Sequence, residues 1–107
     1  MGLDAEIIGV GPFTREIAGL LDYPSEYYEN ARDGAIVTTR LFGCLTSADS
    51  HALAKCFGFE AFDFNRHHLQ DQTVNEDSLR ALFGAEEVDR FLLLKSKGFQ
   101  FHYRPNG

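Results

Sequence analysis

The sequence contains no apolar run that is long enough to cross a membrane. Its runs of large apolar side chains are short, such as residues 91–94, whereas a membrane-spanning helix needs about 20 apolar residues. Residues 1–6 lack the basic region and the apolar stretch of a secretory signal. We therefore expect a cytoplasmic protein that does not bind a membrane.

Basic residues are scarce. Ten Lys and Arg residues stand against 16 Asp and Glu residues, which gives a formal net charge of −6 at pH 7. Binding to nucleic-acid phosphates or to anionic lipid needs clustered Lys and Arg residues that displace counterions. The charge balance therefore argues against nucleic acid and favours a basic protein partner.

The chain has only two cysteines, Cys44 and Cys56, and no Cys-x-x-Cys motif. Two thiols in a reducing compartment are expected to stay free. Cys44 stands between a predicted strand and a predicted helix, where the helix dipole can lower the pKa of a thiol. An enzyme that depends on this thiol or binds a small molecule, built from Cys44, His51, His67 and His68, is therefore one functional hypothesis.

Metal-ligand patterns are weak. His67 and His68 are adjacent, so their side chains diverge and at most one of them joins a given site. A zinc site would need two further ligands from elsewhere in the chain. The paired acids at 76–77 and 86–87 lie in the first turns of predicted helices, where negative charge is stabilising. We predict no metal, no cofactor and no set of catalytic residues.

The chain does contain enough apolar residues for one core. Leu, Ile, Val and Phe make up 30 of the 107 residues, well above the roughly one-fifth level that is typical of disordered chains. A chain of this length forms one compact domain, residues 1–107.

Local patterns predict three strands and four helices. Alternation and β-branched residues favour strands at 3–10, 35–42 and 99–104. Apolar stripes between capping residues and terminal glycines favour helices from Thr14 to Pro24, over 47–57, from Asn75 to Gly84 and over 86–97. Residues 58–74 stay unassigned.

This order predicts an α/β or α+β fold with a small three- to four-stranded mixed sheet, backed by about four helices in a single layer. The connection from Gly11 to Gly34 is long enough for a right-handed crossover between parallel strands. The last strand suits an exposed edge that pairs with its copy in a homodimer.

Gly9 and Gly11 lie just before a predicted helix, in a pattern that is used elsewhere to hold phosphate groups. Thr14 replaces the third glycine of the dinucleotide fingerprint, and Pro12 removes a backbone donor. We interpret the glycines as a plain turn.

Residues 22–33 are the most informative segment, because they hold three of the four tyrosines together with four acids. Tyrosine offers a large contact area at low entropic cost, and carboxylates steer a basic partner toward it. The alternative is that the tyrosines pack this segment onto the core while the acids face water. The candidate contact residues are Tyr23, Glu26, Tyr27, Tyr28, Glu29 and Asp33.

Residues 24–30, Pro-Ser-Glu-Tyr-Tyr-Glu-Asn, resemble the Pro-Glu-Tyr-Tyr-Gly-Glu-Asn stretch of barstar, an acidic ribonuclease inhibitor. The resemblance covers about seven residues and implies a small parallel sheet backed by helices. The barstar binding helix continues past this motif, whereas here Asp33, Gly34 and a predicted strand follow. The first hypothesis, based on the acidic and tyrosine-rich segment, the small size and the lack of a catalytic constellation, is a non-catalytic protein-binding module, such as an inhibitor or an immunity factor.

Overall fold

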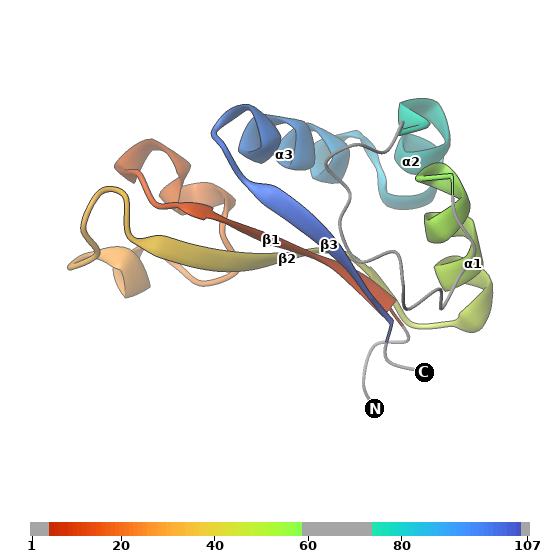
Figure 1. The fold of residues 1–107 in the computed structure, drawn as a ribbon, viewed down its shortest axis with the longest axis horizontal. Helices are drawn as coiled ribbons and strands as arrows, with labels where there is room; N and C mark the ends of the chain where they lie inside the picture. The colour runs from red at the N-terminus through yellow and green to blue at the C-terminus, as the bar shows by residue number, and fades with distance from the viewer. Residues whose placement is uncertain (1–4, 59–73, 106–107) are drawn as a thin grey trace.

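The computed structural model describes residues 5–58 and 74–105 (Figure 1). The elements follow the chain in the order β1 (Ala5–Pro12), η1 (Arg15–Leu20), η2 (Ser25–Tyr28), β2 (Ile36–Cys44), α1 (Ser47–Cys56), α2 (Glu76–Phe83), α3 (Ala85–Ser96) and β3 (Gln100–Pro105). The elements η1 and η2 are 3-10 helices. Within the described residues, no helix is long and apolar enough to cross a membrane.

The three strands form one sheet in the order β2-β1-β3, and both pairs are antiparallel. The fold is therefore α+β, and the predicted parallel crossover after β1 is wrong. Phe13 extends the pairing of β1 with β2, because its N–H donates to Ala35 O and its carbonyl accepts from Gly34 N, both at 2.8 Å. The chain that leaves β1 thus returns as β2 directly beside it, in the opposite direction, and does not cross a face of the sheet. The parallel sheet that the resemblance to barstar implied is likewise not observed.

The α-helix predicted from Thr14 to Pro24 is also wrong. This stretch contains the six-residue η1, and Thr14 makes no side-chain cap at its start. A 3-10 helix is suited to such short pieces, and here it brings Ile17 and Leu21 into the core. The segment is a folded connection, too short to cover the sheet.

The other helices lie close to their predicted positions. The Thr46 side chain accepts a hydrogen bond from Asp49 N at 3.1 Å, and Asn75 caps α2 through Ser78 N at the same distance. Figure 1 shows α1, α2 and α3 on one side of the sheet. Strand β3 lies at one edge of this sheet, and its pairing with a second copy stays a prediction.

The strands alternate between the two faces of the sheet, as β residues do. Ile7, Leu41 and Tyr103 are each exposed by 1% or less and belong to the core. Ile8 pairs with Arg40 on β2 and with His102 on β3, so these three share the opposite face.

The glycines of β1 accommodate aromatic rings. A Cβ added at Gly11 would lie 2.5 Å from Cδ1 and 2.9 Å from Cα of Phe99, and one at Gly9 would lie 2.9 Å from Phe101 Cε1. Both glycines lie inside the strand, so the predicted turn at this position is wrong. They are needed because two phenylalanines cross the strand at contact distance.

We expect Gly11→Ala to lower the free energy of unfolding by about 1–3 kcal/mol, because the Phe99 backbone cannot move away without distorting the sheet. Gly19→Ala is the matched control, since an added Cβ there meets nothing within 4 Å. The control should change stability by less than about 0.5 kcal/mol. Urea unfolding followed by circular dichroism measures both, and equal stability of the two variants would contradict this account of Gly11.

Candidate binding surface

Two of the three tyrosines in the segment 22–33 are exposed. Tyr23 is 56% exposed and Tyr27 is 68% exposed, and their rings stack with centroids 4.6 Å apart. Tyr28 is only 4% exposed and stacks on Phe13 with centroids 5.4 Å apart. Tyr28 therefore anchors the segment to the core and is removed from the predicted contact surface.

Arg15 fixes the backbone beneath these rings. Its guanidinium donates to the carbonyl oxygens of Tyr28 at 2.6 Å, Glu29 at 2.8 Å and Ala31 at 2.9 Å. It also lies 5.4 Å from the centre of the Phe13 ring. The chain at the end of η2 is thus held by three hydrogen bonds to one side chain.

Strand β2 begins beside the exposed rings. Ile36, its first residue, is 71% exposed. A hollow of about 240 Å³ joins these elements, lined by Tyr23, Tyr27, Tyr28, Ile36, Val37 and Thr38. We call the exposed residues Tyr23, Tyr27 and Ile36 the tyrosine patch.

Acidic residues stand close to Tyr23 and Tyr27 in the sequence. Glu26, Glu29 and Asp33 are exposed, and among the described residues their side chains form no ion pair. Asp22 differs, because its carboxylate is engaged inside the protein. Three of the four acids of this segment are therefore available to an external cation.

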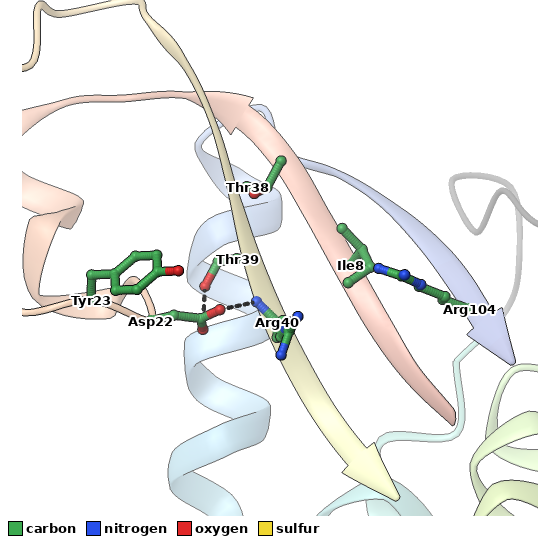
Figure 2. A pocket seen from close by; sticks show the side chains of 7 residues that line it. All are labelled: Ile8, Asp22, Tyr23, Thr38, Thr39, Arg40 and Arg104. Atoms are coloured by element: carbon green, nitrogen blue, oxygen red, sulfur yellow. Dashed lines mark hydrogen bonds between the residues drawn. The ribbon is translucent and has the colours of Figure 1, made fainter. Parts of the chain in front are cut away.

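A second hollow, of about 660 Å³, adjoins the tyrosine patch (Figure 2). It lies on the sheet face opposite the helices, where Ile8 pairs with Arg40. We call it the arginine groove, and it is lined by Ile8, Asp22, Tyr23, Thr38, Thr39, Arg40 and Arg104. Tyr23 and Thr38 line both hollows.

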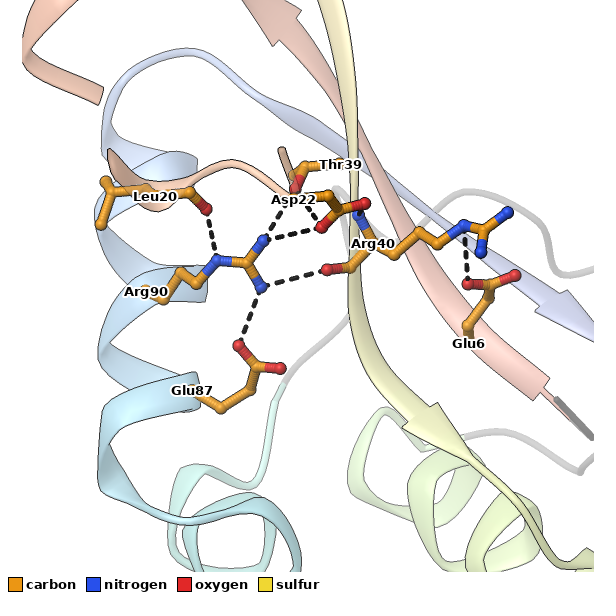
Figure 3. A network of polar contacts seen from close by, with 7 residues as sticks. All are labelled: Glu6, Leu20, Asp22, Thr39, Arg40, Glu87 and Arg90. Carbon is orange, nitrogen blue, oxygen red and sulfur yellow. Dashed lines mark hydrogen bonds and ion pairs between the residues drawn. The ribbon is translucent and has the colours of Figure 1, made fainter. Parts of the chain in front are cut away.

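Arg90 of α3 connects the edge of the sheet to η1 (Figure 3). Its guanidinium donates to Arg40 O at 3.0 Å and to Thr39 Oγ1 at 2.7 Å, and it forms ion pairs with Asp22 and Glu87. Its second backbone partner is the carbonyl of Leu20.

Asp22 completes this network. Its two carboxylate oxygens accept from the Thr39 hydroxyl and from the backbone N–H of Arg40, each at 2.9 Å. The backbone N–H and C=O groups of Arg40 on the outer edge of β2 are therefore both bonded, the first to Asp22 and the second to Arg90. Sequence reasoning missed this network, because neither Arg90 nor Asp22 stands in a local pattern that points to the other.

Of the four residues of the thiol hypothesis, the structure describes Cys44 and His51. Cys44 is 1% exposed, and its sulfhydryl donates to the Phe42 carbonyl at 3.4 Å. Cys56 is also buried, and burial raises the pKa of its thiol. His51 lies on the exposed side of α1, and His67 and His68 lie outside the described residues. The ranges 5–58 and 74–105 hold no cluster of three or more metal-ligating side chains.

Comparison with known proteins gives no relative. No protein-family model matches the chain, and neither the curated proteins nor the solved structures contain a significant match.

We expect Arg90→Lys to destabilise the protein by about 1–3 kcal/mol, because a lysine cannot satisfy the acceptors that the planar guanidinium reaches together. Arg80→Lys is the control, since Arg80 pairs with the exposed Asp89 and an exposed pair contributes less than about 1 kcal/mol. Denaturant unfolding compares the two variants. An Arg90→Lys protein as stable as Arg80→Lys would show that the network is dispensable.

Because the side chain of Tyr28 is buried, we expect the stability of the protein to fall at alkaline pH. Burial raises the pKa of Tyr28 above its ordinary value, so the unfolded chain loses this proton at lower pH than the folded protein does. Stability is then complete below about pH 10 and falls as the pH rises through the raised pKa. Tyr28→Phe should reduce the slope of this alkaline loss, measured by urea unfolding between pH 8 and pH 11. If the free energy of unfolding falls equally with pH in both proteins, Tyr28 does not contribute to the alkaline loss of stability.

Proposed function

We propose that this protein is a non-catalytic binding module of the cytoplasm, similar to an inhibitor or an immunity factor, that recognises a basic protein through the tyrosine patch. The supporting observation is the stacked pair of Tyr23 and Tyr27, both more than half exposed. Aromatic side chains with this exposure are typical centres of protein interfaces. The rings lie beside the exposed Ile36, which adds apolar contact area.

Rigidity favours the same function. Arg15 holds three carbonyl groups of the segment, and Tyr28 stacks on Phe13 beneath the exposed pair. A surface that is ordered before binding loses less conformational entropy when a partner arrives. The exposed rings thus supply contact area at a reduced entropic cost.

The charge around the patch defines the chemistry of the partner. Glu26, Glu29 and Asp33 present carboxylates without an internal cation among the described residues. Such charges accelerate the encounter with a surface of Lys and Arg residues and disfavour acidic proteins. The proposed partner therefore carries an apolar centre surrounded by basic side chains.

Tyr23→Ser/Tyr27→Ser should abolish capture of this partner from a lysate of the source organism, measured by quantitative mass spectrometry with a tagged protein. Loss of an aromatic interface centre costs at least about 2 kcal/mol, or about thirtyfold in affinity. Both residues are exposed, so the double variant should remain folded, whereas replacing the buried Tyr28 would disturb the core. Circular dichroism checks the fold.

Leu45→Ser is the matched control, because Leu45 is 74% exposed and follows the opposite end of β2 from Ile36. Glu26→Lys/Glu29→Lys should slow association with the purified partner and weaken its dependence on salt. A partner that binds the tyrosine variant and the Leu45 control equally well would overturn the proposal.

A further inference from the structure

The structure holds positive charge that the overall acidity of the chain conceals. We propose that the arginine groove binds an anionic small molecule, with Arg40 and Arg104 holding its carboxylate or phosphate group while Ile8 and Tyr23 contact its uncharged part. This inference goes beyond the proposed function, because it concerns a second hollow and a different class of ligand.

The sheet brings the two arginines together from opposite sides of β1. Arg40 on β2 pairs with Ile8, and Arg104 on β3 pairs with Glu6, two residues before Ile8. Residues two apart in a strand share one face. Figure 2 shows the Arg104 side chain extended across the sheet toward Ile8, with Arg40 on the other side of that residue.

A buried carboxylate positions one of these arginines. Glu6 is only 3% exposed, and its Oε1 atom lies 3.5 Å from Nε of Arg40 (Figure 3). A buried carboxylate is stable only beside a cation or hydrogen-bond donors, so Glu6 attracts the Nε side of the guanidinium. Within residues 5–58 and 74–105 Arg40 forms no other ion pair, and its two terminal nitrogens can reach an external ligand, since its side chain is 65% exposed. Their parallel N–H groups match the two oxygens of a carboxylate or phosphate.

The local charge favours an anion. Among the described residues, Arg40 forms an ion pair with Glu6, and Arg104 forms none. Asp22 also lines the groove, but its oxygens accept from the Thr39 hydroxyl and from the backbone N–H of Arg40, and it pairs with Arg90, which also pairs with Glu87. The lining of the groove therefore holds two arginines and one carboxylate, and that carboxylate is already bonded within the protein.

The size and the lining of the groove indicate a small ligand with an apolar part. Its volume of about 660 Å³ lies inside the range of roughly 300–1,000 Å³ that is usual for small-molecule pockets. The exposed ring of Tyr23 and the side chain of Ile8 offer apolar contacts next to the cations. Two arginines on a protein of charge −6 do not suit an extended polyanion. A single anionic group on a compact molecule fits both observations.

Titration of the ¹⁵N-labelled protein, followed by amide chemical shifts, tests this inference with three probes: inorganic phosphate, phenyl phosphate and benzoate. Saturable shifts are expected at the amides of Ile8, Thr38, Arg40 and Arg104. Phenyl phosphate should bind more tightly than inorganic phosphate, because its ring contacts Tyr23 and Ile8. The comparison of phenyl phosphate with benzoate identifies the preferred anionic group, and saturation by either one at these amides supports the groove.

Arg40→Gln and Arg104→Gln should each weaken binding of the best probe about tenfold, as expected for the loss of a charge-assisted hydrogen bond. Arg32→Gln is the matched control, since it removes the same charge from the exposed connection before β2. Ile36→Ser alters the tyrosine patch at an exposed residue that does not line the groove, so it should leave probe binding unchanged and separates this inference from the proposed function. The amide spectrum of each variant verifies its fold.

Three results would overturn the inference. They are the absence of saturable shifts with all three probes, affinities that stay unchanged in both groove variants, and an equal loss of affinity in the Arg32 control.

Discussion

The ion pair between Arg90 and Asp22 determines how the two surfaces of this protein are placed. Arg90 belongs to α3 and Asp22 follows η1, so the pair joins the helical side of the sheet to the connection between β1 and β2. Both side chains also bond the outer edge of β2 at Arg40. An edge strand with free backbone groups is open to pairing with other chains. At this position those groups are bonded internally, and Tyr23, the residue after Asp22, is fixed in place at the border of the two hollows.

The sequence predicted the parts of the fold that local interactions determine. The caps at Thr46 and Asn75 lie within three residues of the backbone groups that they bond, so α1 and α2 could be bounded from the sequence alone. The alternation at 99–104 likewise predicted β3, in which Phe101 and Tyr103 are buried. The direction of β2 relative to β1 depends on contacts between distant residues, such as Phe13 with Ala35. No periodicity within either strand encodes that direction.

The irregular connection between β1 and β2, residues 13–35, explains why the candidate surface was only partly predictable. Tyr27 and Tyr28 are adjacent, yet one ring is exposed and the other is buried, and the two rings meet edge to face at 80°. The sequence favoured all three tyrosines equally, because a segment without a clear period does not indicate which face meets the core. The acids Glu26, Glu29 and Asp33 were identified correctly as exposed. Asp22 belongs to the same segment but was not among the candidate contact residues, and its partner Arg90, 68 residues away in the chain, was not foreseen.

A bulge in β2 shows the same dependence on distant contacts. Ala5 pairs with Cys44 and Ile7 with Leu41, so β2 carries one extra residue between these pairs. Phe42 lies there with φ of 54°, a left-handed conformation that is rare for a bulky residue. The bulge lets consecutive residues Leu41 and Phe42 both enter the core, where Phe42 contacts the rings of Phe83 and Phe91.

Net charge is a poor guide to a surface on which charges of opposite sign are separated. The segment that carries Tyr23 and Tyr27 also has three exposed carboxylates, whereas the adjoining groove carries Arg40 and Arg104. Exposed charges separated by more than roughly 8–10 Å are largely screened at physiological salt, so a ligand responds mainly to the groups nearest to it. The acidic total disfavours a long polyanion, which would have to cross both regions. It does not exclude a single anionic group, because such a group need approach only the arginines. The same sequence can therefore present an acidic surface for a basic protein and, beside it, a cationic groove for a small molecule.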